Sequence, residues 1–185
     1  MLVRFLFILA TLEAAGASTH TLENGRVRMR VDSRWQENVT GTRDHRRMFE
    51  LRGQGQPQIH AVLWLQVMRG QSVESRVAGI RSRVRPLKRL PAHDSRDACV
   101  LSYDEGTGTW LAIDRIARRA DITVHARLAW RTDILPTGVS KDWLVEQANT
   151  LVADIEVDGR SVGAVARLVE APTTGKDLDL VEARK

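Results

Sequence analysis

The sequence contains a single cysteine, Cys99, among 185 residues. An intramolecular disulfide is therefore excluded, and with it the small disulfide-stapled folds that are common outside the cell. Cys99 lies in DACVLSY, an apolar segment of strand-forming residues. We therefore expect a buried, inert thiol rather than a nucleophile. The chain has to be held together by its hydrophobic core.

The common metal-binding and catalytic motifs are also missing. There is no Cys-x-x-Cys or His-Glu-x-x-His arrangement, and His45, His60, His93 and His125 are widely separated. There is no Gly-x-Ser-x-Gly motif, and GTGTW lacks the lysine and the following helix of a phosphate-binding loop. We predict no catalytic residue, no metal site and no cofactor, so the expected protein is not an enzyme.

Two alternatives to this prediction remain open. His60 and His125 could meet on neighbouring strands as metal ligands. Ser102 or Cys99 could form a nucleophilic triad with His125 and Asp114, although all of them lie in predicted strands rather than on a strained turn. Polar residues that face solvent across a sheet explain them better. A small periplasmic hydrolase built around His125 is therefore the alternative function.

Long hydrophobic runs are scarce, and the opening segment MLVRFLFILATLEAAGAS is the informative one. A positively charged start is followed by an apolar run from Phe5 to Leu12 and then by small residues, the order of a secretory signal peptide. A membrane anchor needs about 20 apolar residues, and Glu13 ends this run too early. We predict cleavage between Ala17 and Ser18, which makes the mature protein periplasmic or secreted, and we expect a bacterial protein.

The remaining chain has the composition of one folded domain. Hydrophobic residues make up 43% of the sequence and charged residues 28%, which argues against disorder and for a solvated surface. We expect a signal peptide over residues 1–17, a single α+β domain over residues 18–171 and a polar C-terminal tail over residues 172–185.

Alternating residues predict the strands. In RVRMRVD, residues 26–32, apolar side chains share one face and arginines the other, as in a half-buried strand. The further predicted strands are residues 48–53, 59–68, 98–104, 109–118 and 122–131. Short turn-compatible links join the last three of these strands, which favours an antiparallel meander.

Two segments have helical spacing instead. Ser72 can cap a helix in which apolar residues follow at steps of three and four, namely Val73, Val77, Ile80 and Val84. Pro86 and Pro91 are expected to end this helix and open a loop. Ser140 can cap a second helix with an amphipathic stripe made of Trp143, Leu144, Gln147, Ala148, Leu151, Val152 and Ile155. Strands in runs with helices between them indicate an α+β domain, an antiparallel sheet covered by two helices.

This order of elements resembles the PsbP-like superfamily, which includes the extrinsic PsbP protein of photosystem II, a yeast Ran-binding factor and bacterial exported proteins of the DcrB type. The similar segments are GRVRMRVDSRW, SVESRVAGIRSRV, the meander 98–131 and SKDWLVEQANTLVADI, so the resemblance covers residues 25–157. It implies an α/β/α sandwich and a binding or assembly role. It carries over no catalytic motif.

The net charge of +5 allows several classes of partner. Because the arginines are spread along the chain, a generally basic surface explains most of them. A denser group crosses the end of the first predicted helix, namely Arg81, Arg83, Arg85, Lys88 and Arg89. Cations there complement the helix dipole, or they form a docking patch for an acidic protein partner or an anionic membrane surface. We expect no nucleic-acid partner.

The predicted function is therefore an exported, non-catalytic protein-binding or assembly factor of the bacterial cell envelope. A cell-envelope accessory factor and an immunity protein that neutralises an exported toxin both fit.

Overall fold

The computed structural model describes residues 16–52, 58–83, 87–90, 97–104, 110–135 and 138–162. The greater part of the predicted signal peptide and the predicted tail 172–185 lie outside these residues. Within them, no helix is both long enough and apolar enough to cross a membrane.

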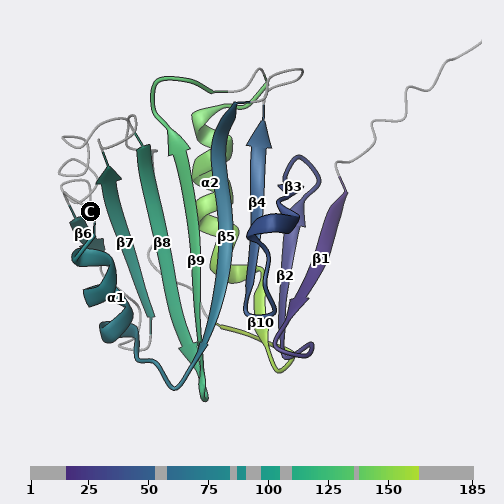
Figure 1. The fold of residues 1–185 in the computed structure, drawn as a ribbon, viewed down its shortest axis with the longest axis vertical. Coiled ribbons are helices and arrows are strands. Elements are labelled where there is room, and N and C mark those ends of the chain that lie inside the picture. The colour runs from purple at the N-terminus through teal and green to yellow at the C-terminus, as the bar shows by residue number, and fades with distance from the viewer. Residues whose placement is uncertain are drawn as a thin grey trace, which may run out of the picture.

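The centre of the fold is a seven-stranded antiparallel sheet (Figure 1). Its three longest strands pair over most of their length, and the strands over residues 97–104, 110–119 and 122–131 form the predicted meander. In spatial order, the strands are β3 (Gln36–Glu37), β4 (Arg46–Arg52), β5 (Ile59–Arg69), β9 (Ile122–Arg131), β8 (Trp110–Arg119), β7 (Asp97–Asp104) and β6 (Leu87–Leu90).

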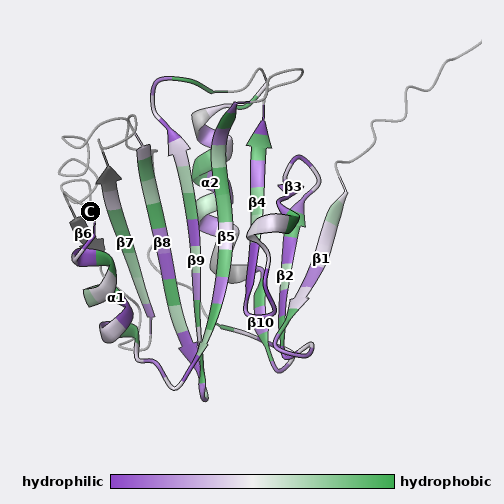
Figure 2. Cartoon of the chain, viewed as in Figure 1, coloured by the Kyte–Doolittle hydropathy of each residue, from purple (hydrophilic) through white to green (hydrophobic). Residues whose placement is uncertain are grey.

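A second, four-stranded sheet lies beyond β3 and β4 (Figure 1). Val27, Met29 and Val31 of its second strand are buried in the same core as Phe49 and Leu63 of the large sheet. The predicted alternation of apolar and arginine side chains is thus confirmed, and Figure 2 shows it as bands along the strand. In spatial order, the strands are β1 (Ala17–Leu22), β2 (Val27–Asp32), β10 (Ile155–Val157) and β11 (Arg160–Ser161).

Two α-helices cover opposite faces of the large sheet. α1 (Val73–Arg81) is capped by Ser72, and its buried side chains cluster with those of β7 and β8, namely Val73, Val77, Ile80, Ala98, Val100 and Ile116. α2 (Lys141–Ala153) contributes Leu144 and Ala148 to the larger core, which contains Leu101 and Ile113. Val100 and Leu101 are successive residues of β7 and therefore point to opposite faces of the sheet. The two helices thus lie on opposite faces of the sheet. The predicted α+β sandwich is confirmed.

The structure corrects three boundaries. α1 ends at Arg81 rather than at residue 84, and residues 87–90 form strand β6 where a loop was predicted. β6 pairs with β7 at the edge of the sheet, where flanking prolines are tolerated. Ile155 was assigned to the second helix but belongs to β10, because the chain there pairs with β2 at Met29.

Leu144 tests the assignment of the buried face of α2. It is 0% exposed, so Leu144→Ala should lower the free energy of unfolding by about 2–5 kcal/mol through the cavity it leaves. Denaturant unfolding measures this change. The control, Glu146→Gln, alters an exposed position on the same helix and should stay within about 0.5 kcal/mol of the parent. Equal stability of both variants would show that the wrong face was assigned.

Candidate functional site

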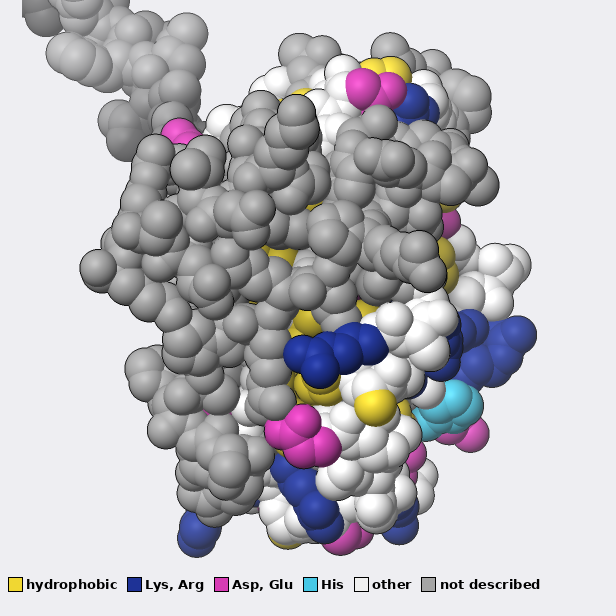
Figure 3. Space-filling view, turned by 90° about the vertical axis from the view of Figure 1, so that its left-hand side faces the viewer, with side chains coloured by type: hydrophobic (Ala, Val, Ile, Leu, Met, Phe, Trp, Pro, Cys, Tyr) yellow, Lys and Arg dark blue, Asp and Glu magenta, His cyan; other side chains and the backbone are white. Residues whose placement is uncertain are grey.

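The predicted basic patch lies at the edge of the large sheet, where α1 ends. Arg81 and Arg83 are exposed there, and neither has an ion-pair partner among the described residues. Lys88 and Arg89 lie on the backbone of the neighbouring edge strand β6, and Arg85 falls outside the described residues. Figure 3 views this side of the molecule and shows basic side chains beside hydrophobic ones.

A buried polar network lies beside α1 and involves three residues that the sequence had singled out. His125 of β9 and Asp114 of β8 are both 0% exposed, and 2.6 Å separates His125 Nε2 from Asp114 Oδ1. Arg76 of α1 donates from Nε to His125 Nδ1 at 2.6 Å. Ser102 of β7 donates from Oγ to Asp114 Oδ2 at 3.5 Å.

This connectivity fixes the protonation of the histidine. A guanidinium can only donate, so Nδ1 of His125 accepts and Nε2 carries the proton that is donated to Asp114. Burial lowers the pKa of His125, and the hydrogen bond to Asp114 only partly opposes this. Burial acts to raise the pKa of Asp114, but the hydrogen bond from His125 and the nearby arginines outweigh it and lower the pKa. The pair is a neutral imidazole and a carboxylate.

The network does not have the arrangement of a nucleophilic triad. In such a triad the histidine lies between the nucleophile and the acid, whereas here Asp114 lies between Ser102 and His125. Arg76 also occupies the nitrogen lone pair with which His125 would act as a base. The second candidate nucleophile is also inert, because burial raises the pKa of the Cys99 thiol to about 11. These contacts instead tie α1 to the sheet.

The alternative of a metal site also lacks support. His125 pairs in register with Gln66, six residues along β5 from His60, so about 20 Å of strand separates the two histidines. Among the described residues there is no group of three or more His, Cys, Asp or Glu side chains that could hold a metal ion.

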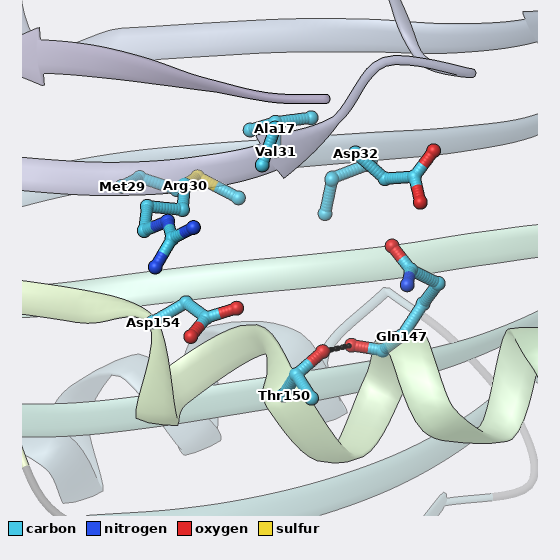
Figure 4. Close-up of a pocket in the computed structure, with 9 residues that line it drawn as sticks. Ala17, Met29, Arg30, Val31, Asp32, Gln147, Thr150 and Asp154 are labelled. Atoms are coloured by element: carbon cyan, nitrogen blue, oxygen red, sulfur yellow. Dashed lines mark hydrogen bonds between the residues drawn. The ribbon is translucent and has the colours of Figure 1, made fainter. Parts of the chain in front are cut away.

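A groove opens on the other side of the molecule, between β2 and α2 (Figure 4). Its volume is about 260 Å³. Trp35 Nε1 donates to Gln147 Oε1 at 3.2 Å, and this bond positions one wall. Arg34 pairs with Asp32 and lies 4.1 Å from the centre of the Trp143 ring. The lining residues are Ala17, Met29, Arg30, Val31, Asp32, Leu63, Gln147, Thr150 and Asp154.

Sequence reasoning singled out the arginines at the end of α1, whose role as a docking patch stays a prediction, but it missed the hydrogen bonds of Arg76 and the groove. Arg76 was one of several arginines on a predicted helix, and nothing in its neighbours indicated a buried partner. The groove needs β2 and α2 side by side, and the exposed positions Arg30 and Asp154 read as ordinary surface residues. The alternation in RVRMRVD is the one signal that places Arg30 on a solvent-facing side.

No family model matches the sequence, and no curated protein shows significant sequence similarity to it. The fold is similar to that of the Ran-binding protein Mog1p of Saccharomyces cerevisiae, with a TM-score of 0.54 and 9% identity over 78% of this chain and 97% of that chain. At this identity the similarity shows the fold alone, and it agrees with the fold that the resemblance implied.

Two further solved structures are less similar. One is a protein from Bacteroides thetaiotaomicron, with a TM-score of 0.48 and 12% identity over 77% of this chain and 48% of that chain. The other is the PsbP protein CyanoP of Synechocystis sp. PCC 6803, with a TM-score of 0.46 and 10% identity over 80% of this chain and 95% of that chain.

The state of His125 predicts how stability depends on pH. In the unfolded chain the imidazole takes up a proton as the pH falls through about 6.5, whereas its lowered pKa keeps it neutral in the folded protein. This contribution to stability is therefore complete above that pH and is lost below it. The loss should approach about 1.4 kcal/mol per pH unit, the limit for one proton. Urea unfolding measured between pH 7.5 and about 5 provides the measurement.

His125→Gln is the informative variant, because glutamine keeps one donor and one acceptor but does not titrate. Its stability should depend less on pH than that of the parent over the same range. His45→Gln removes an exposed histidine and serves as the control, which should retain the parental dependence. An unchanged pH dependence in His125→Gln would contradict the assigned protonation state.

Proposed function

We propose that this chain is an exported, non-catalytic binding protein of the bacterial cell envelope that docks on an acidic protein partner. The observation that carries the proposal is the pair of exposed arginines at the end of α1, Arg81 and Arg83, which have no ion-pair partner among the described residues. They lie beside the edge strand β6, which contains Lys88 and Arg89. Unpaired rim charges of one sign favour association with a surface of opposite charge.

Electrostatics within the fold add to this basic character. Burial lowers the pKa of Arg76, and the nearby Arg83 lowers it further. The positive charge of Arg83 is therefore felt as far along α1 as Arg76, and a surface of opposite charge is attracted to this region.

A non-catalytic role is supported by the buried network. His125, Asp114 and Ser102 are buried and bonded to one another or to Arg76, so none of them is presented to a substrate. The fold adds a weaker support, because the similar yeast protein Mog1p is named as Ran-binding and thus binds a protein. An envelope accessory factor and an immunity protein that neutralises an exported toxin are the two roles that fit.

Export predicts a defined N-terminus. The first strand begins at Ala17, so cleavage between Ala17 and Ser18 would leave nearly all of β1 in the mature protein. N-terminal sequencing of the protein recovered from the periplasm or medium of a bacterial host should find Ser18 first. A chain that keeps Met1 and stays with the cytoplasmic fraction would contradict export.

Charge reversal tests the docking surface. Arg81→Glu combined with Arg83→Glu should weaken binding to the partner at least about tenfold, because two attractive contacts become repulsive. The partner is first captured from envelope extract with the exported protein, then purified and titrated. Arg28→Glu combined with Arg160→Glu makes the same change in net charge at exposed positions elsewhere and should bind like the parent.

The same titration distinguishes the classes of partner. Binding to an acidic protein should weaken as salt is added, because exposed charges are screened beyond about 8 Å at physiological ionic strength. Co-sedimentation with anionic phospholipid vesicles, lost in the Arg81/Arg83 variant, would assign the patch to a membrane surface instead. Equal partner binding by the parent and both double variants would overturn docking through this patch.

A further inference from the structure

The groove between β2 and α2 exists because the neighbour of β2 changes along its length from the strand β10 to the helix α2. β10 pairs with β2 only as far as Met29, and the last backbone bond runs from the Arg30 amide to the Asp154 carbonyl at 3.4 Å. Beyond this bond the neighbour of β2 is α2, whose backbone groups bond within the helix. Strand and helix therefore face each other through side chains, and a volume of about 260 Å³ remains between them.

Two opposite charges stand side by side at one end of the groove. Arg30 and Asp154 are both exposed, and the bond between their backbones keeps the two residues adjacent. Figure 4 shows the Arg30 guanidinium pointing from β2 towards α2, with the Asp154 carboxylate next to it. No salt bridge joins the two side chains, and neither has another ion-pair partner among the described residues.

The rest of the groove is different in character. Its floor consists of Met29, Val31 and Leu63, which are buried in the core. At the far end the Gln147 carbonyl accepts from Trp35, which leaves the amide N–H groups of Gln147 as donors. Asp32 is nearby, but Arg34 already neutralises it. Only the Arg30–Asp154 end therefore offers free charges.

We propose that this groove binds a free α-amino acid. Its carboxylate pairs with Arg30 and its ammonium with Asp154, while its side chain extends over the apolar floor towards Gln147. A simple anion or cation is attracted by one of the two charges and repelled by the other, whereas a zwitterion satisfies both without adding net charge. The volume agrees, because 260 Å³ lies just below the lower end, about 300 Å³, of ordinary ligand pockets.

The geometry also predicts selectivity for the side chain. A neutral side chain with an apolar stem suits the floor of Met29 and Val31, and a terminal acceptor suits the Gln147 amide. Leucine, methionine and glutamine are the expected ligands. Lysine and glutamate should bind more weakly, because their charges would be placed over an apolar surface.

Calorimetric titration of the full chain, which keeps the lining residue Ala17, with these five amino acids tests the proposal. Leucine, methionine or glutamine should bind with saturation. The N-acetyl and carboxamide derivatives of the same amino acid should each bind at least about tenfold more weakly, because each lacks one of the two charges. Absence of saturable binding by all five, or equal binding of the blocked derivatives, would overturn the proposal.

Variants separate this site from the rest of the surface. Arg30→Gln and Asp154→Asn should each weaken binding at least about tenfold, and because both positions are exposed the variants should keep the parental melting temperature. Arg28→Gln is the matched control, an exposed arginine on the same strand outside the groove, and should bind like the parent. Parental binding by Arg30→Gln would overturn the proposal. The Arg81/Arg83 variant should bind amino acids normally, so failure of the docking surface and failure of the groove can be distinguished.

Discussion

The fold depends on the antiparallel pairing of β5, β9 and β8, because these strands have both faces covered or partly covered. Successive residues on each strand point to opposite faces of the sheet, so each strand has to match a different environment on each face. On the α2 side, Leu65, Ala126 and Leu128 belong to the hydrophobic core, and the buried Arg115 of β8 donates to the Ala148 carbonyl of α2. On the α1 side, His125 and Asp114 are buried among polar groups. Arg76 and Ser102 complete the hydrogen bonds of this pair, which offsets the cost of burying it.

Sequence reasoning found the elements whose pattern is set locally and missed those set by pairing. The alternation of apolar residues alone predicted β2, at Val27, Met29 and Val31, and Ser72 predicted the start of α1. By contrast, β1, β6 and β10 were not predicted as strands. Each is short or lies at an edge, and each is defined by the strand beside it, such as β7 for β6 and β2 for β10. Such segments carry little signal of their own, because their hydrogen bonds are made to residues distant in the sequence.

In the candidate sites, too, sequence reasoning succeeded where a local pattern decides and failed where distant contacts decide. Ser102, Asp114 and His125 could be placed on neighbouring strands from the sequence, and the meander does bring them together. Their chemistry could not be predicted, because it is decided by Arg76 from α1, the helix that packs on β7 and β8. The guanidinium makes the imidazole an acceptor, and this turns a possible catalytic pair into a structural contact. Arg81 and Arg83 were predicted as surface residues because they lie off the apolar stripe of the helix, and both are exposed.

The two proposed binding surfaces lie at opposite ends of the molecule, and the core between them separates their roles. The basic patch follows α1 at the β6 edge, whereas the groove lies beside β2 in the smaller sheet (Figure 1). No residue is shared, and the patch has one sign of charge whereas the groove pairs both signs. A macromolecule held at the β6 edge would leave Arg30 and Asp154 accessible. The groove can therefore be occupied in the free and in the docked protein. Any coupling between the two surfaces would have to pass through the packed strands β5, β9 and β8 that lie between them.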